Sequence, residues 1–429
     1  MASAPSLFDG LAVLLTLTAV FGWLNLRFLR LPQSIALLTT GLIVSGVVLV
    51  GRQVAPEFAG FTTGLVAALD RLDFSRAVLD GVLAFILFAG ALQIDFDELR
   101  DRLLPIGILA TVGTLISTAM VTGLFWGAAR LLDFPLPAAW ALVFAALISP
   151  TDPVAVMATL RGSKLPKRVA MVMEGESLFN DGVGVVLFLA FLATATGAEA
   201  PDPLSIGGGV LLESLGGIVL GAAAGWLTYR AMRLVDEYVV EVMLSLALVT
   251  GTYALAQHIH VSGPIAMVVA GLVIGNRGMA RGMSEQTRHY VGAFWLLVGE
   301  ILNALLFLLI GLEVLVLDLD FNHLLLALLA IPIALFARFA AVATPMLATA
   351  WRKGVRLAPV TLLTWGGVRG GISIALALSI RSPDYRDTIL TATYAVVLFT
   401  VVLLGLTIGP VTRRLYPGQR ALDGGPDGA

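Results

Sequence analysis

Residues 135–160 read PLPAAWALVFAALISPTDPVAVMATL, an apolar stretch long enough to cross a bilayer as a helix but interrupted by Ser149-Pro150-Thr151-Asp152-Pro153. A second apolar stretch, 357–380, is interrupted by Gly366-Gly367-Val368-Arg369-Gly370-Gly371. Proline removes a backbone donor and glycine lets a helix unwind. Irregular backbone at membrane depth is tolerated only where it is buried in protein or lines a cavity. The two interruptions therefore predict a site inside a membrane protein.

The composition of the whole chain agrees with a membrane protein. Of 429 residues 58% are hydrophobic and 13% are charged, whereas soluble domains carry roughly a quarter charged residues. Alternating ten-residue segments typical of a membrane barrel are absent, so we expect an all-α fold. A net charge of -2 gives no sign of a nucleic-acid partner, and the lack of cysteine excludes disulfides and thiolate metal sites.

The hydropathy pattern predicts about thirteen transmembrane helices, joined by short connections. Their approximate ranges are 7–26, 34–50, 74–93, 103–128, 135–160, 168–195, 205–229, 239–257, 261–275, 290–317, 322–351, 357–380 and 386–411. With the N-terminus outside, 19 of the 27 Lys and Arg residues fall on the inside, 6 fall outside, and Arg338 and Arg369 lie within the membrane. This asymmetry supports the count and predicts a cytoplasmic C-terminus.

The spacing of the interruptions predicts an internal symmetry. The interrupted stretches are the fifth and twelfth spans. If spans 1–6 and 8–13 are repeats, these two correspond, and their odd separation makes the repeats inverted. Paired broken helices in inverted repeats are typical of secondary transporters with a site near the membrane midplane. We therefore expect residues 1–416 to form one transmembrane unit and residues 417–429 a disordered cytoplasmic tail.

The sixth span carries acidic residues, which are costly inside a membrane and usually functional. Helical spacing places Glu174, Ser177 and Asp181 on one face, and Glu176 and Asn180 on a neighbouring face.

These positions predict an all-oxygen cage. Asp181, the Ser177 hydroxyl, the Asp152 carboxylate and a freed carbonyl near Thr151 would suit a hard cation such as sodium. No His or Cys lies nearby, which argues against a transition metal. Burial disfavours a charged carboxyl group, so a proton competes with the cation for Asp181.

Two acids have simpler interpretations. Asp152 could cap a helix. A buried acid with arginines available favours an ion pair over a ligand, so we interpret Glu176 as structural. Arg338 and Arg369 are both available, and the sequence does not decide between them.

Four segments carry a family resemblance: SPTDPVAV (149–156), EGESLFNDGVGVVLF (174–188), LNALLFLLIGLEV (302–314) and TWGGVRGGISIALAL (364–378). Together they resemble the monovalent cation/proton antiporters of the NhaP/NHE type, from about the fifth span to the thirteenth. The resemblance implies a homodimer, a core domain of about spans 3–6 and 10–13 with two crossing unwound helices, and a dimerisation domain from the other spans.

The resemblance also implies residue roles. Thr151, Asp152, Ser177 and Asp181 would bind Na⁺, and Glu176 would pair with a buried arginine. The Asn180–Asp181 pair resembles the electroneutral branch, with one proton exchanged per sodium. Many relatives carry an acid where this chain has Ala89, so the outer shell of the site differs.

The expected activity is exchange of Na⁺ or Li⁺ for H⁺, with no enzymatic reaction, no cofactor and membrane lipid as the surroundings. A potassium/proton antiporter of the same fold is the nearest alternative. A cation channel and an intramembrane aspartyl protease using Asp152 and Asp181 are alternatives from other classes. The expected location is the plasma or inner membrane of a prokaryotic cell.

Overall fold

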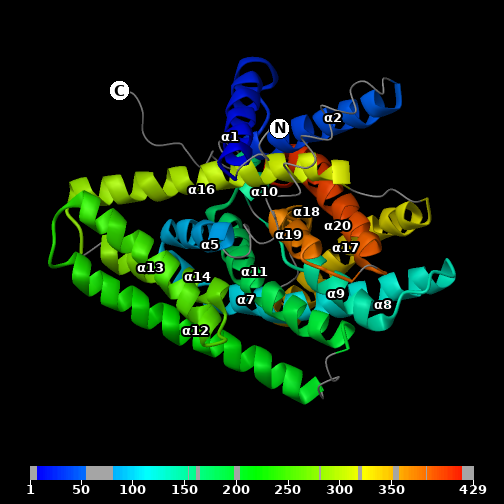
Figure 1. The fold of residues 1–429 in the computed structure, drawn as a ribbon. Coiled ribbons are helices and arrows are strands. Elements are labelled where there is room, and N and C mark those ends of the chain that lie inside the picture. Colours follow the sequence, from blue (N-terminus) through cyan, green and yellow to red (C-terminus); the bar gives the residue numbers. More distant parts are fainter. Residues whose placement is uncertain are drawn as a thin grey trace.

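The computed structural model describes residues 7–54, 81–152, 154–160, 165–197, 203–279, 282–316, 321–350, 357–382 and 384–417 (Figure 1). Regular structure within these ranges is entirely helical, which confirms the all-α prediction. Pro153, the first part of the predicted span 74–93 and residues 418–429 of the predicted tail lie outside the described residues.

The helices follow the predicted spans closely. In the first half of the chain they are α1 (Leu7–Leu24), η1 (Asn25–Leu29), α2 (Gln33–Val54), α5 (Leu83–Leu92), α6 (Phe96–Arg100), α7 (Leu103–Ile108), η4 (Leu109–Gly113), α8 (Thr114–Leu131), α9 (Ala138–Ile148), α10 (Val154–Leu160) and α11 (Lys167–Ala195). In the second half they are α12 (Pro203–Met232), α13 (Tyr238–His258), α14 (Gly263–Val273), η5 (Ile274–Gly278), α16 (Glu285–Glu313), η6 (Val314–Val316), α17 (Phe321–Ala350), α18 (Leu357–Trp365), α19 (Gly371–Leu378), α20 (Arg386–Phe399), η7 (Thr400–Leu404) and α21 (Gly405–Leu415).

Nine of the helices within the described ranges are long and apolar enough to cross a membrane, and three shorter apolar helices accompany them. The number of crossings, predicted as thirteen, stays a prediction. One boundary differs visibly from its predicted range, because α16 begins at Glu285 and not near residue 290. The Ser284 hydroxyl accepts the Thr287 N–H at 3.3 Å and caps the helix there, so α16 gains a polar first turn.

In Figure 1 the long helix α16 crosses the molecule below α1 and α2, and α12 runs along the lower edge. Helix α2 packs on α16 at a point where two glycines meet. A Cβ added at Gly41 would lie 2.9 Å from the Gly311 Cα, and Ser45 Oγ donates to the Gly311 carbonyl at 2.8 Å. Small residues of this kind let apolar helices approach backbone to backbone. Helix α12 packs on α14 in the same way, since a Cβ at Gly221 would overlap the backbone of Ala266.

Helix α11 lies between α16 and α12 (Figure 1). It packs on α9, α7 and η4 and also contacts α12 and α14 (Figure 1). The acidic residues predicted for the site are all carried by this central helix or by the interruption beside it. The division into core and dimerisation domains stays a prediction.

Both stretches predicted to be interrupted consist of two separate helices in the structure. Helix α9 ends at Ile148 and α10 begins at Val154, while α18 ends at Trp365 and α19 begins at Gly371. The two interruptions touch, because the Asp152 N–H donates to the Val368 carbonyl at 2.8 Å. Segments more than two hundred residues apart in the sequence thus meet inside one structure.

Candidate functional site

The first interruption frees backbone groups that a continuous helix would have bonded. The Leu147 carbonyl accepts the Ser373 hydroxyl at 2.7 Å, and the Pro150 carbonyl accepts Arg369 Nη1 at 3.2 Å. Together with the Asp152 N–H bond to Val368, these contacts supply partners that water would supply elsewhere. The irregular backbone is therefore held by groups from the second interruption and from α19.

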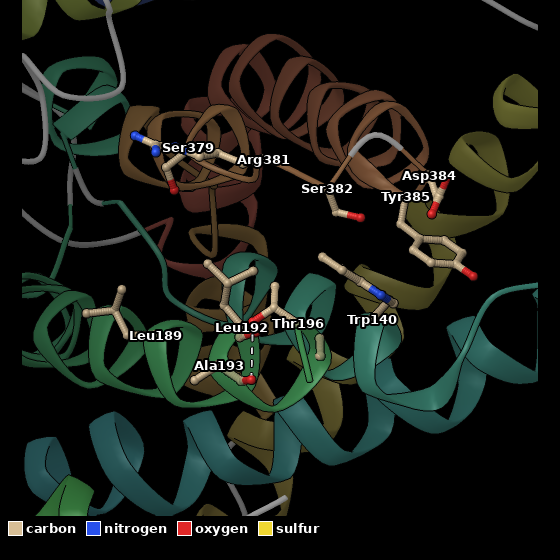
Figure 2. Close-up of a pocket in the computed structure, with 11 residues that line it drawn as sticks. Trp140, Leu189, Leu192, Ala193, Thr196, Ser379, Arg381, Ser382, Asp384 and Tyr385 are labelled. Atoms are coloured by element: carbon tan, nitrogen blue, oxygen red, sulfur yellow. Dashed lines mark hydrogen bonds between the residues drawn. The ribbon is translucent and has the colours of Figure 1, made fainter. Parts of the chain in front are cut away.

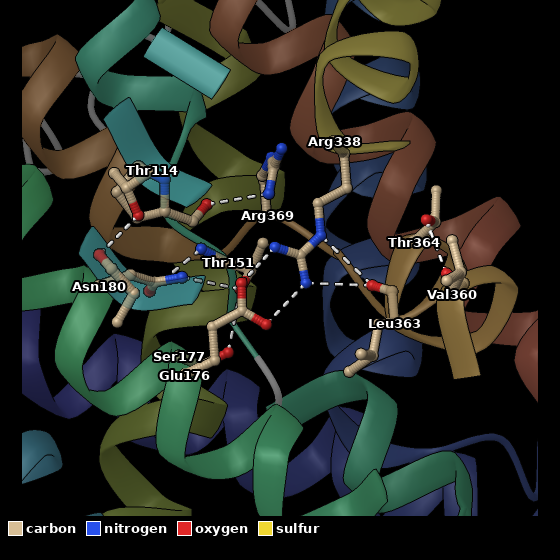
Figure 3. A network of polar contacts seen from close by, with 12 residues as sticks. Thr114, Thr151, Glu176, Ser177, Asn180, Arg338, Val360, Leu363, Thr364 and Arg369 are labelled. Carbon is tan, nitrogen blue, oxygen red and sulfur yellow. Dashed lines mark hydrogen bonds and ion pairs between the residues drawn. The ribbon is translucent and has the colours of Figure 1, made fainter. Parts of the chain in front are cut away.

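Helix α11 holds the interruption from the other side, through Thr151 (Figure 3). The Thr151 N–H donates to Asn180 Oδ1 at 3.4 Å, and Asn180 Nδ2 donates to Thr151 Oγ1 at 3.1 Å. The Thr151 and Ser177 hydroxyls lie 3.0 Å apart. All three side chains are buried. Because both ends of the Asn180 amide are in use, its orientation is fixed.

A small cavity opens where the two interruptions meet. Its volume is about 10 Å³, and the lining residues with an oxygen atom in the side chain are Thr151, Asp152, Asp181 and Ser373. Pro150, Gly370 and apolar side chains complete the wall. This volume is close to the minimum for one water molecule. In the described ranges no third His, Cys or acidic side chain joins the two carboxylates in a cluster.

The two carboxylate oxygens of Asp152 have different neighbours. Oδ1 accepts the Val154 N–H at 2.8 Å and so caps the start of α10. Oδ2 lies beside Gly370 of the second interruption. Asp152 therefore both caps a helix and lines the cavity.

Glu176 pairs with Arg338, which settles the partner that the sequence leaves open (Figure 3). Arg338 Nη2 donates to Glu176 Oε2 at 2.9 Å, Nη1 donates to Oε1, and both side chains are buried. Arg338 also donates from Nε and Nη2 to the Leu363 carbonyl, at 3.2 and 3.0 Å. Leu363 stands in the last turn of α18, so this arginine supports the helix that precedes the second interruption.

Arg369 is bonded differently. Its side chain is 1% exposed, and none of the ion pairs found among the described residues includes it. Its Nη1 donates to the Pro150 carbonyl, its backbone N–H donates to Thr400 Oγ1 at 3.1 Å, and its Nε has no hydrogen-bond partner. Among the described residues, therefore, this positive charge next to the first interruption forms no ion pair with a carboxylate.

The structure brings most of the predicted residues together. Thr151, Asp152 and Asp181 line the cavity, while Ser177 and Asn180 bond to Thr151 without lining it. The sequence reasoning missed Gly370 and Ser373, which line the same cavity. Gly370 belongs to the predicted second interruption, whereas Ser373, the third residue of α19, has no signal in the sequence.

Ala89 is buried on α5 and packs against Gly299 of α16. It does not line the cavity between the interruptions.

A larger pocket of about 790 Å³ is lined by residues of α9 and α11 and by the residues that follow α19 (Figure 2). Helices α9 and α11 also line the small cavity. On α11 the small cavity is lined by Asp181 and Val185, and the large pocket by Leu189 and Leu192. Spacings of three and four residues put all four on one helix face. The two spaces thus follow one another along α11.

The sequence matches a known protein family over nearly its whole length. The family model described as "Sodium/hydrogen exchanger, transmembrane" matches residues 14–414. The chain is 43% identical to the Na(+)/H(+) antiporter NhaP of Pseudomonas aeruginosa over 417 residues, covering 96% of this chain and 98% of that protein. It is 36% identical to the Na(+)/H(+) antiporter NhaH of Halobacillus aidingensis, covering 91% of this chain and 93% of that protein.

The fold matches a solved structure as well. The sodium proton antiporter MjNhaP1 from Methanocaldococcus jannaschii superposes with a TM-score of 0.71 at 21% identity, covering 96% of this chain and 99% of that one. The match to the family model and the identity to full-length relatives agree with the multi-pass helical structure. The chain is a multi-pass integral membrane protein and belongs to the sodium/hydrogen exchanger family.

Proposed function

We propose that this protein exchanges Na⁺ for H⁺ across the membrane by alternating access, and that both ions compete for Asp181. Asp152 and Thr151 are the further cation ligands of the cavity. Ser177 acts with them through its hydroxyl contact to Thr151. The observation that carries the proposal is the pair of carboxylates in one small cavity between two interrupted helices.

The charges around the cavity favour one ion at a time. Asp152 and Asp181 contribute two negative charges and Arg369 one positive charge, while Glu176 and Arg338 neutralise each other. The empty site then carries one net negative charge, which either one Na⁺ or one H⁺ neutralises. Because an uncompensated charge in a membrane interior is costly, only the loaded site crosses readily between the two faces. Exchange of one proton for one sodium follows, without net charge movement.

The cavity also suits a cation that has lost its water. A space of about 10 Å³ has no room for a hydrated ion, so oxygen atoms of the wall must replace the hydration shell. Hard cations take such oxygen ligands from carboxylates, hydroxyls and unwound backbone. The larger pocket along α11 would be the water-filled route on the side that we assign to the outside. Val185, Leu147 and Leu376 form the apolar part of the wall next to it.

The first experiment measures sodium-dependent proton movement in proteoliposomes containing wild type or Asp181→Asn. We expect loss of exchange, because the amide binds neither a proton nor Na⁺ as a carboxylate does. Asp133→Asn, on an exposed turn where its φ of 52° suits Asn equally, is the matched control and should retain wild-type activity. Wild-type exchange in Asp181→Asn would refute the assignment of this residue.

The pH dependence tests the competition. Lowering the pH protonates the shared carboxylate and removes the site that Na⁺ needs, so the apparent KM for Na⁺ should rise by up to about tenfold per pH unit while the maximal rate stays similar. The same vesicles, tested with Na⁺, Li⁺ and K⁺, separate the sodium and potassium hypotheses. Currents far above exchange rates would point to a channel.

The stoichiometry depends on Asn180, which holds Thr151 without adding a charge. Asn180→Asp would give the site a second net negative charge. Exchange by wild type should be insensitive to an imposed membrane potential, and exchange by Asn180→Asp should respond to it. A potential-sensitive wild type would contradict the one-to-one exchange.

We further assign α1, α2, α12, α13 and α14 to a scaffold through which two copies dimerise, and the remaining helices to a moving core. The exposed apolar side chains along α12, such as Leu212 and Val219, support a partner or lipid on that face. The assigned orientation has the N-terminus outside and the C-terminus in the cytoplasm. Labelling of single cysteines added at the two ends of the chain, which has none of its own, checks this orientation.

A further inference from the structure

The second interruption supplies one wall of the cavity through Gly370. A Cβ added there would lie 2.6 Å from the Asp152 Cγ and still closer to Oδ2, so a side chain at 370 cannot coexist with the present position of the carboxylate. The backbone of Gly370 is extended, with φ -110° and ψ -170°, a conformation open to other residues. Space, and not backbone conformation, therefore calls for glycine at this position.

The same wall carries a hydroxyl group. Ser373 is 4% exposed, lines the cavity and donates its proton to the Leu147 carbonyl at 2.7 Å. A hydroxyl whose proton is engaged keeps its lone pairs as acceptors. Since the bond to Leu147 fixes the oxygen in place, Ser373 can offer a neutral oxygen to an ion in the cavity.

We propose that Ser373 sets how tightly the site binds a cation and that Gly370 sets which cation the site prefers. Ser373 Oγ is a neutral cation ligand, and the missing side chain of Gly370 leaves the room in which the Asp152 carboxylate reaches the ion. The inference rests on the proposed cation exchange and adds the wall opposite Thr151 to its site. Neither residue carries a charge, so substitutions at either position leave the stoichiometry of exchange unchanged.

The two residues have separable effects. Removing the Ser373 hydroxyl takes away one oxygen whatever the ion, and so weakens cation binding. Adding a methyl at Gly370 pushes the Asp152 carboxylate into a cavity that is already small. The remaining space should then favour the smaller Li⁺ over Na⁺, and Na⁺ over K⁺.

The experiment measures exchange in proteoliposomes with Li⁺, Na⁺ and K⁺ for wild type, Ser373→Ala, Ser373→Thr and Gly370→Ala. Ser373→Ala should raise the KM for Na⁺ about five- to tenfold, the size expected for one lost polar interaction, with the maximal rate within about twofold. Ser373→Thr keeps the hydroxyl and should recover most of the affinity. Gly370→Ala should raise the Li⁺/Na⁺ preference by about fivefold or more.

Matched controls exist on the same chain. Ser45→Ala removes a buried hydroxyl that bonds a carbonyl of another helix, that of Gly311, at 2.8 Å, and Ser45 lines neither the small cavity nor the large pocket. Gly123→Ala adds a methyl where the nearest atoms are more than 4 Å away. Neither control should change the ion preference. Ser373→Ala also leaves the Leu147 carbonyl without its partner, so Tm is recorded for each variant. A rise in KM without a matching fall in Tm then reports on cation binding and not on stability.

Several results would overturn the inference. An unchanged KM for Na⁺ in Ser373→Ala, or a Gly370→Ala variant that loses maximal rate equally for all three ions with unchanged ratios, would show that the wall is structural only. If Gly370→Ala fails to fold, the two Ser373 variants decide. A wild type that exchanges no cation would refute the proposed function itself. An active wild type with unaltered variants would refute this inference alone.

Discussion

The two helix interruptions differ in how their arginines are bonded. Arg338 donates to the Leu363 carbonyl beside the second interruption and is neutralised by Glu176. Arg369 donates to the Pro150 carbonyl in the first interruption, and among the described residues it forms no ion pair. Both arginines thus stabilise freed carbonyls, but only one leaves its charge available. In the proposed exchange, Arg338 is a structural support and Arg369 supplies the positive charge that balances the carboxylates of the cavity.

The largest expected effect comes from removing the paired arginine. Arg338→Met leaves the Glu176 carboxylate buried and unpaired, which should lower the free energy of unfolding by about 3–5 kcal/mol. Thermal unfolding in detergent measures it. The double variant Glu176→Gln/Arg338→Met should regain much of this loss, because no unpaired charge remains. If the double variant is no more stable than Arg338→Met, the stabilising effect of Arg338 comes from its hydrogen bonds to the Leu363 carbonyl and not from its ion pair with Glu176.

Arg369 should act on ion binding more than on stability. Arg369→Met removes a positive charge next to the cavity, so Na⁺ should bind several-fold more tightly, and turnover should fall because release slows. Arg369→Lys keeps the charge and should keep near-wild-type affinity. Calorimetric titration of Na⁺ into the purified protein distinguishes the two. Weaker binding in Arg369→Met than in Arg369→Lys would reverse the assigned role.

A substitution of Asn180 can remove hydrogen bonds to the first interruption without changing the charge of the site. Asn180→Ala removes bonds to both the N–H and the hydroxyl of Thr151, at a cost of about 1–3 kcal/mol for the buried groups left unpaired. The KM for Na⁺ should rise, because Thr151 is no longer held at the cavity wall. Exchange and thermal unfolding are compared with Asn276→Ala, whose amide bonds the carbonyls of Ile94 and Leu272 away from the cavity. Equal effects on KM from both variants would contradict the prediction.

The smallest effect is expected beside the second interruption. Thr400→Val keeps the shape of the side chain but removes the acceptor of the Arg369 N–H. The expected loss of stability is about 1 kcal/mol, near the lower end for a buried N–H left unpaired, with little change in KM. Thermal unfolding and exchange assays on one preparation test both parts. A loss comparable with that of Arg338→Met would remove the contrast between the two arginines.

The sequence predicted the parts of the site that depend on local pattern. Proline and glycine runs located both interruptions, and helical spacing placed Ser177 and Asp181 near each other on α11. The partner of Glu176 needed the structure, because Arg338 and Arg369 are both intramembrane arginines and nothing local ranks their distances. Ser373 needed it too, since a serine early in an apolar helix has no signal of its own. Its place in the site depends on a hydrogen bond to Leu147, which is 226 residues away in the sequence.

Thr400 belongs to η7, a π-helical turn between α20 and α21 that contains one residue more than an α-helix would. Such a turn is what remains when a continuous helix gains a single inserted residue. Deleting one residue there would restore a regular helix but rotate everything on one side of it by about 100°. Either Thr400 would leave Arg369, or α21 would turn a different face to its neighbours. The length of this segment is therefore fixed more strictly than its composition, and relatives should tolerate substitutions in it far more readily than insertions or deletions.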